Sequence, residues 1–444
     1  MLRHIVAGLI VAGLILLQFS SNFFSFKVAG VLSLGCLITL QLANVFLGRE
    51  NVRRGSLQFN MFTIVCLGLF CYHAMHDLVS RALASDIKQS IVDSMGDLFI
   101  AAGLAYFGFV HKASDQFQRW FAVCVSLGAY SAVNLLGYKL GFKSILATEE
   151  NITAIGNVTA ERMLAPFSSG VNSFGTVCSL GLCLALFTGR HAYNQRQALM
   201  LWISGAVFVV NLVCVYLVQI RSALIALLFS FLLLYLQERK KKTNSSSSLP
   251  VAVAWSSVVV LVALPMAFYK LAAVSFIDAV VPTRAYELIG RHSQDFSFLG
   301  GRAFIWDSAW GLLQQGEVGI LGQGIERRDS STVLGDFLGT ELPTRTSYHN
   351  GFVEFTMVYG AVAAVVLIVV LGMTIGSIKR SIEASSNENE RKTHQLRLAM
   401  LVACVAISFL EAFSASPFFW GTFLCLVFAP MWNSSTPRQA ARAA

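Results

Sequence analysis

The chain has 444 residues, of which 55% are hydrophobic and only 13% are charged, and its formal net charge is +9. Soluble domains contain about 25% charged residues, so this composition excludes a soluble globular protein and indicates a membrane protein. The basic excess does not point to nucleic acid, because membrane proteins concentrate Lys and Arg in their cytoplasmic loops. We therefore expect the lipid bilayer as a partner and no nucleic acid.

Apolar runs of about 20 residues recur along the chain and predict an all-α polytopic membrane protein. Only helices satisfy their backbone within one segment inside a bilayer. The first run has a basic start but no clear small-residue cleavage site, which favours a membrane helix over a signal peptide. We predict about 12 transmembrane helices, at 4–19, 28–47, 59–78, 92–110, 119–137, 170–188, 198–218, 222–236, 251–269, 351–374, 397–413 and 416–432.

Lys and Arg alternate between the predicted loops. With the N-terminus in the cytoplasm, the inner loops hold the basic clusters, among them Arg239–Lys242, and the short outer loops hold only Lys27, Arg81, Lys88 and Arg221. The positive-inside rule then predicts both termini in the cytoplasm. We expect polar connectors at 238–248 and 381–395 on that side, and a turn at Pro166 that leads into the sixth helix.

The chain divides into three predicted regions: helices 1 to 9 in residues 1–270, a large extracytoplasmic loop in 271–350, and helices 10 to 12 with a cytoplasmic tail in 351–444. Polar segments as long as 271–350 are usually functional. This segment contains six arginines and nine acidic residues, so bulk charge does not attract an anion to it. Individual arginines would have to bind one.

Two arginines are candidate anion ligands. Arg221 is a lone cation between two apolar runs, and its guanidinium could instead extend to the lipid head groups. Arg302 follows Gly300-Gly301 at the predicted start of an amphipathic helix, where free N–H groups favour phosphate. A salt bridge from Arg302 to Asp307 is the simpler alternative.

Tyr348, His349 and Asn350 form a polar cluster immediately before the tenth predicted helix. Histidine titrates near neutral pH, so His349 could accept a proton from a hydroxyl nucleophile, although a single histidine is more often structural. The nine cysteines lie in apolar runs, and neither an Asp-x-Asp pair nor a cluster with metal spacing occurs. We expect no metal and no cofactor.

Polar residues within the predicted helices gather towards the outer side, among them His73, His76 and Asp77 at the end of the third helix. Such residues are expensive in lipid, so they indicate an outward-facing cavity rather than a channel. The simplest interpretation of His73 and His76 is two hydrogen-bonded interfacial residues. Asp97 is the best candidate for the midplane acid that a proton-coupled transporter would need.

Four stretches occur in the order VNSFGTVC, QIRSALIALL, LGGRAFIWDSAWGLL with GILGQG, and YHNGFVEFTMVYG. In this order, and with a large outer loop between helices 9 and 10, the chain resembles the O-antigen ligase and O-antigen polymerase superfamily of bacterial envelope enzymes. The resemblance covers residues 155–375. The chain differs from the family pattern at Ile220 and at Glu317-Val318-Gly319, which leaves the subfamily open.

The resemblance implies a metal-independent, inverting glycosyltransferase in the bacterial inner membrane, with its active site facing the periplasm. The donor would be a polyprenyl-diphosphate-linked glycan, and the acceptor a hydroxyl of lipid A–core or of a second lipid-linked glycan. Arg221 and Arg302 would hold the diphosphate, His349 would be the base, and Arg162, Tyr348 and Asn350 would be weaker binding residues. A protein oligosaccharyltransferase and a non-enzymatic flippase of lipid-linked sugars are the alternatives.

Overall fold

The computed structural model describes residues 116–142, 163, 165–168, 171–218, 221–243, 302–316, 318, 320–322, 350–385 and 388–410, together with residues 72, 75, 76, 78 and 79. Secondary structure in this part of the chain is entirely helical. The helices are α5 (Gln116–Lys139), α7 (Val171–Asn194), α8 (Ala198–Val218), α9 (Arg221–Thr243), α13 (Arg302–Gln314), α15 (Gly351–Ala384) and α16 (Glu388–Leu410).

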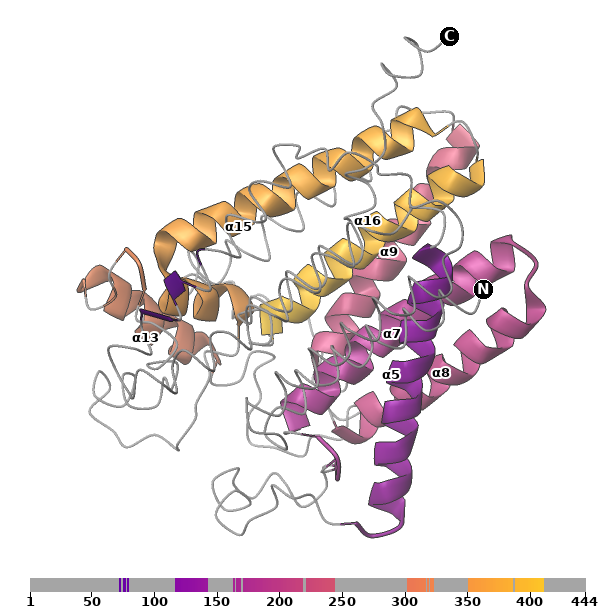
Figure 1. Ribbon diagram of the computed structural model, residues 1–444, viewed down its shortest axis with the longest axis horizontal. Helices are drawn as coiled ribbons and strands as arrows, with labels where there is room; N and C mark the ends of the chain where they lie inside the picture. The colour runs from indigo at the N-terminus through magenta and orange to yellow at the C-terminus, as the bar shows by residue number, and fades with distance from the viewer. Residues whose placement is uncertain are drawn as a thin grey trace, which may run out of the picture.

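The long helices alternate in direction, so their connections collect at two opposite ends of the bundle (Figure 1). One end, which we call the basic end, contains the start of α5, the α7–α8 turn, the end of α9 and the α15–α16 turn. The other end, which we call the junction end, contains the end of α5, the α8–α9 junction and the start of α15. Helix α13 lies beside the start of α15 at the left edge of the view.

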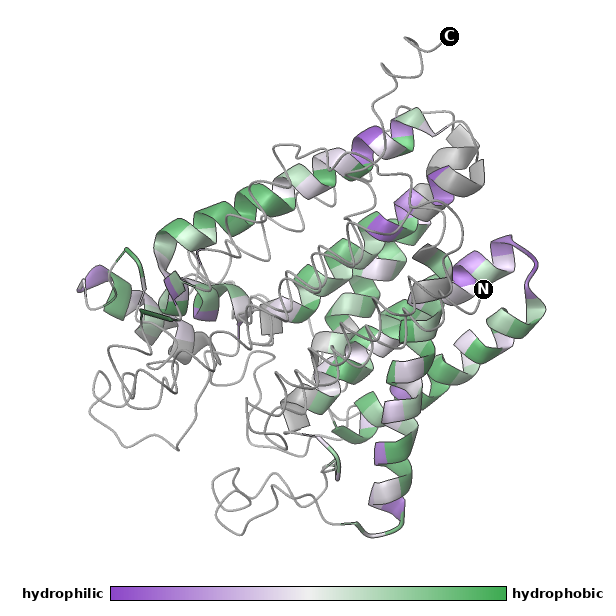
Figure 2. Cartoon of the chain, viewed as in Figure 1, coloured by the Kyte–Doolittle hydropathy of each residue, from purple (hydrophilic) through white to green (hydrophobic). Residues whose placement is uncertain are grey.

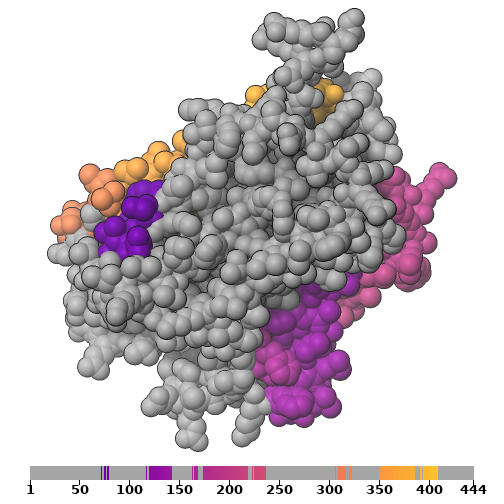
Figure 3. Space-filling view, in the orientation of Figure 1, coloured from indigo at the N-terminus to yellow at the C-terminus, as the bar shows by residue number. Residues whose placement is uncertain are grey.

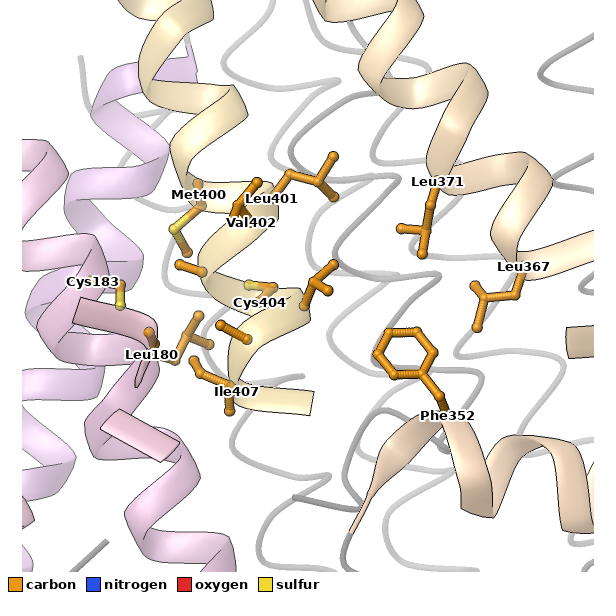
Figure 4. Packing of buried hydrophobic residues seen from close by; sticks show 14 of the residues in the cluster. Leu180, Cys183, Phe352, Leu367, Leu371, Met400, Leu401, Val402, Cys404 and Ile407 are labelled. Carbon is orange, nitrogen blue, oxygen red and sulfur yellow. The ribbon is translucent and has the colours of Figure 1, made fainter. Parts of the chain in front are cut away.

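Helix α16 is the centre of the core. Its residues from Leu398 to Ile407 are all buried, which is typical of a helix enclosed by protein on every side. It packs against α9, α15 and α7. Figure 4 shows Met400, Cys404 and neighbouring residues of α16 between Leu180 and Cys183 of α7 on one side and Leu367 and Leu371 of α15 on the other.

Three described helices are long and apolar enough to cross a membrane: Trp120–Lys139, Ala198–Val218 and Gly351–Ala384. Their apolar residues form the green middle parts of the ribbons in Figure 2. The helical segments predicted at 119–137, 198–218, 222–236 and 351–374 fall within described helices, and α7 covers 171–188 of the segment predicted at 170–188. Helix α16 also covers 397–410 of the segment predicted at 397–413. The total of twelve and the three-region division stay predictions, because the other predicted segments lie wholly or mostly outside the described residues.

The predicted polar connector at 381–395 is wrong over most of its length. Helix α15 continues to Ala384, and α16 begins already at Glu388. Both helices extend beyond their apolar parts because charged residues are good helix formers in water. Lys379 and Glu383 lie one turn apart there, with 3.9 Å between Nζ and Oε1.

Arg397, the first residue of the predicted helix 397–413, lies well inside α16, and it is buried. Its Nη1 is 2.9 Å from Nδ1 of His394, one turn earlier. Since a guanidinium can only donate, His394 Nδ1 accepts this hydrogen bond. The basic end therefore contains an arginine that belongs to the core.

Candidate active site

The first ten residues of α15, Gly351 to Gly360, are all buried, whereas buried and exposed residues alternate beyond them. Asn350 caps this helix: its side-chain oxygen accepts hydrogen bonds of 2.9 Å and 3.0 Å from the amides of Phe352 and Val353. Asn350 itself is fully buried. The residue that follows the predicted base is therefore fixed inside the protein, while His349 and Tyr348 lie outside the described residues.

Glu354 is a buried acid in the first turn of the same helix, with 1% of its surface exposed. Its amide donates a 2.9 Å hydrogen bond to the carbonyl of Asn350. A negative charge is favourable near the N-terminus of a helix because the free amides point towards it. The sequence analysis did not select Glu354, although an acid four residues after Asn350, in a predicted membrane segment, was a usable signal.

Helix α15 is broken at Gly360, where φ is +87° and ψ is 170°. Gly322, from the GILGQG stretch, has φ of +81° and lies against this break. A Cβ atom on Gly322 would overlap the backbone of Val358, and one on Gly360 would overlap the backbone of Ile320 and Leu321. Only glycine fits at such a backbone crossing, so the stretch docks into the break in α15.

Helix α13 confirms the predicted amphipathic helix. Trp306, Ala309 and Leu312 are buried on one face, and the helix packs against α15. Its first residue is Arg302, so the predicted position of this arginine at a helix N-terminus is correct. The side chain of Arg302 lies outside the described part.

Helix α9 begins at Arg221, directly after a two-residue junction that follows α8. The side chain of Arg221 is likewise not described. Val218 and Ala223, on the two sides of the junction, are fully buried in one apolar cluster with Phe174 of α7. The last turn of α8 and the first turn of α9 are therefore packed into the core at the junction end of the bundle.

A short segment around Pro166 packs against α5 and α8 at the junction end. The amide of Met163 donates to the carbonyl of Leu217 at 3.0 Å. The Tyr130 hydroxyl donates to the Phe167 carbonyl at 2.7 Å, and the Phe167 amide donates to Asn134 at 2.9 Å. The predicted turn at Pro166 is present, and its hydrogen bonds fix it to α5 and α8. Arg162 precedes it, outside the described residues.

The described elements thus bring the starts of α9 and α15 to one end of the bundle, with α13 against α15. Helix N-termini carry unpaired amides and partial positive charge, so this end suits an anionic ligand. Among the described residues, no group of three His, Cys, Asp or Glu side chains could hold a metal ion, and the expected metal independence stays a prediction.

A comparison with protein families agrees with this arrangement. Residues 206–368 match the family model described as O-antigen ligase. The chain carries an O-antigen ligase domain. A comparison with curated proteins gives no significant match. The O-antigen ligase domain extends from within α8 to the middle of α15, so it contains Arg221, Arg302 and His349. Arg162 and the third predicted helix precede it.

The match over residues 206–368 agrees with the family resemblance and supports an O-antigen ligase-type function in polysaccharide biosynthesis at a membrane. It also includes Gly322, Gly360 and the buried Glu354. The two glycines could have been suspected from GILGQG and VYG, but no local pattern indicates that they touch each other.

Proposed function

We propose that the protein is a glycosyltransferase that transfers a glycan from a polyprenyl-diphosphate carrier to a hydroxyl acceptor during the biosynthesis of a cell-surface polysaccharide. The observation that carries this proposal is the O-antigen ligase domain at 206–368, which combines three candidate residues with three helix starts. Arg221 begins α9, Arg302 begins α13, and His349 is separated from α15 only by its cap, Asn350.

The two arginines bind the donor diphosphate in this proposal. Arginine keeps its charge and offers paired donors that match phosphate oxygens. The amides at the starts of α9 and α13 add partial positive charge. They are already oriented before the reaction, so they need no reorganisation as charge develops on the leaving diphosphate. Arg162 contributes a further charge, and Tyr348 and Asn350 contribute weaker contacts to the substrates.

The reaction proposed is a direct displacement at the anomeric carbon. The acceptor hydroxyl oxygen forms the new glycosidic bond while the bond from the anomeric carbon to the diphosphate oxygen breaks. The electron pair leaves with the polyprenyl diphosphate, whose charge Arg221 and Arg302 hold. The proton of the acceptor hydroxyl passes to His349. Attack from the side opposite to the leaving group inverts the anomeric configuration.

The charge distribution supports a site on the periplasmic side of the inner membrane. The basic end of the bundle contains Arg190, Arg196, Arg239–Lys242 and the cations around the α15–α16 turn. The positive-inside rule assigns such an end to the cytoplasm, so the junction end lies outside. In this orientation both chain termini are cytoplasmic, and the donor reaches the site after its sugar has crossed the membrane.

The test supplies the purified protein in lipid vesicles with a polyprenyl-diphosphate glycan. One set receives lipid A–core as acceptor, and the other receives a second lipid-linked glycan. A single shift in the mass of lipid A–core identifies a ligase, and a ladder of products identifies a polymerase. Activity retained in excess chelator supports the metal-independent mechanism.

The second candidate is a non-enzymatic flippase of lipid-linked sugars, and Asp97 is its candidate midplane acid if transport is coupled to protons. The same vesicles distinguish it. Movement of the lipid-linked glycan across the bilayer without a new glycosidic bond would replace the glycosyltransferase proposal. New bond formation that is lost in both Arg302→Ala and His349→Ala, with normal amounts of protein in the membrane, supports it.

A further inference from the structure

The break in α15 contacts the third predicted membrane helix as well as the GILGQG stretch. The hydroxyl of Tyr72 donates a 2.8 Å hydrogen bond to the carbonyl of Tyr359, the residue before Gly360. A helix break leaves nearby carbonyls without the amides that would normally pair with them. Tyr72 therefore donates a hydrogen bond to a carbonyl at the break and joins the third predicted helix to α15.

His76 lies one helical turn after Tyr72 and binds the docked stretch. Its Nε2 is 2.6 Å from the carbonyl oxygen of Leu321, the residue before Gly322. Because a carbonyl only accepts, Nε2 carries the proton in this contact. Among the described residues, none forms a hydrogen bond with the buried Nδ1 of His76, so the ring is oriented by this one hydrogen bond.

Aromatic contacts also join the third predicted helix to α15. The His76 ring meets the Tyr359 ring edge-on at 5.5 Å between centroids, and it lies 5.7 Å from the Tyr72 ring. Figure 3 shows the indigo residues of the third predicted helix at the surface beside the orange residues of α13 and the start of α15. Two side chains of one helix therefore contact both backbones of the glycine crossing.

The glycine crossing fixes Gly322, after which the chain segment that leads to the predicted base, His349, begins. The chain leaves Gly322 at the break and returns at Asn350, which caps the same helix. The nine helical residues between that cap and Gly360 span about 14 Å at 1.5 Å per residue. On the other side, α13 with Arg302 at its start leads to Gly322 within eight residues of its end. His76 thus binds the chain at Leu321, which lies between Arg302 and His349 in the sequence.

We infer that His76, with Tyr72, is a positioning residue that holds Leu321 and Gly322 in the break of α15 and so aligns Arg302 and His349 for glycan transfer. The inference rests on the function proposed above. It goes beyond that function because His76 and Tyr72 precede the O-antigen ligase domain. The third predicted helix is then part of the machinery of transfer without touching the substrates.

The test compares two substitutions of His76. His76→Phe keeps an aromatic ring but removes the donor, and His76→Gln keeps a donor nitrogen at a similar distance from the backbone. Met75→Ala is the matched control, because Met75 is the exposed neighbour. A misplacement of about 1 Å can cost about 10²-fold in rate. We expect kcat of His76→Phe to fall by about that factor, with KM for the donor little changed. His76→Gln should keep most of the wild-type kcat, and Met75→Ala should match wild type.

Hydrogen exchange gives a readout that does not need activity. The peptide containing Val318 to Gly322 should exchange faster in His76→Phe than in wild type, and His76→Gln should return it towards the wild-type rate. Wild-type kcat in His76→Phe, an equal loss in both variants, or unchanged exchange would each overturn the inference. If the wild-type protein formed no glycosidic bond, the proposed function would fail, and the exchange rates alone would then decide whether His76 holds the crossing.

Discussion

The amide of Met163 donates a 3.0 Å hydrogen bond to the carbonyl oxygen of Leu217, and this contact fixes the segment before α7 to the last turn of α8. Met163 follows Arg162 directly, and Leu217 lies four residues before Arg221. The contact supports a common role for the two arginines at one anion.

Arg162→Ala should raise KM for the lipid-linked donor and leave kcat close to wild type. A cation that is remote from the reacting bond stabilises the bound substrate and the transition state equally, so its loss weakens binding alone. Steady-state kinetics with varied donor measures both constants. Lys139→Ala, an exposed cation at the same end of the bundle, should match wild type. A fall in kcat at unchanged KM would contradict the binding role.

Arg302→Ala should lower kcat/KM by about 10²–10³-fold, as expected when a donor to the developing charge is lost. Arg302→Lys should recover only part of it, because lysine keeps the charge but not the paired donors. Arg391→Ala, an exposed cation near the opposite end, is the matched control. Equal rates for the Lys and Arg forms would show that charge alone is sufficient.

His349→Ala should lower kcat by about 10²–10⁴-fold, the usual contribution of a general base. In wild type, a base must be unprotonated to accept the hydroxyl proton. The rate should therefore rise with pH as His349 loses its proton and level off once the ring is unprotonated. A pH–rate profile of both proteins checks this expectation. The same rising limb in His349→Ala would assign the base to another residue.

Asn350→Ala should destabilise the protein by about 1 kcal/mol, because two amides at the start of α15 lose their acceptor. Asn350→Ser should lose less, since serine is also a good cap. Thermal unfolding in detergent, read at equal protein concentration, compares the two. If Asn350→Ser were as stable as wild type but inactive, the side chain would have a role in the reaction besides capping.

Gly360→Ala should lower both stability and activity, because the positive φ and the backbone of Ile320 leave no room for a methyl group. Gly376 lies in the same helix and has open space around its Cβ position, so Gly376→Ala should be neutral or slightly stabilising. Unfolding temperature and transfer rate in both variants test this contrast. Equal stability of the two would show that the break in α15 does not need glycine.

Hydropathy predicted the helices well where their ends coincide with the ends of apolar runs. The predicted helix 198–218 has the same bounds as α8, because Gln197 and Gln219 flank a mostly apolar run without charged residues. It failed at 381–395, where α15 and α16 continue into water. The apolar signal reports the thickness of the bilayer core rather than the length of a helix.

The arrangement of the site could be predicted only in part. The helix starts at Arg221 and Arg302 follow from local patterns, and the amphipathic face of α13 was correctly assigned. The break at Gly360 was not predicted, since glycines are frequent in membrane helices and its backbone conformation depends on Gly322. His76 was interpreted as an interfacial residue because its partner, Leu321, lies 245 positions away in the chain.

The break in α15 also divides the helix into parts with different tolerance to mutation. Gly351 to Gly360 are enclosed by protein on all sides, so a change in side-chain size there requires a compensating change in α13, in the GILGQG stretch or in the third predicted helix. Beyond it, Val362, Val365, Ile368 and Val369 are exposed and need only remain apolar. Natural variants of this protein should therefore drift freely along the outer surface of α15, whereas its first three turns should change together with distant segments.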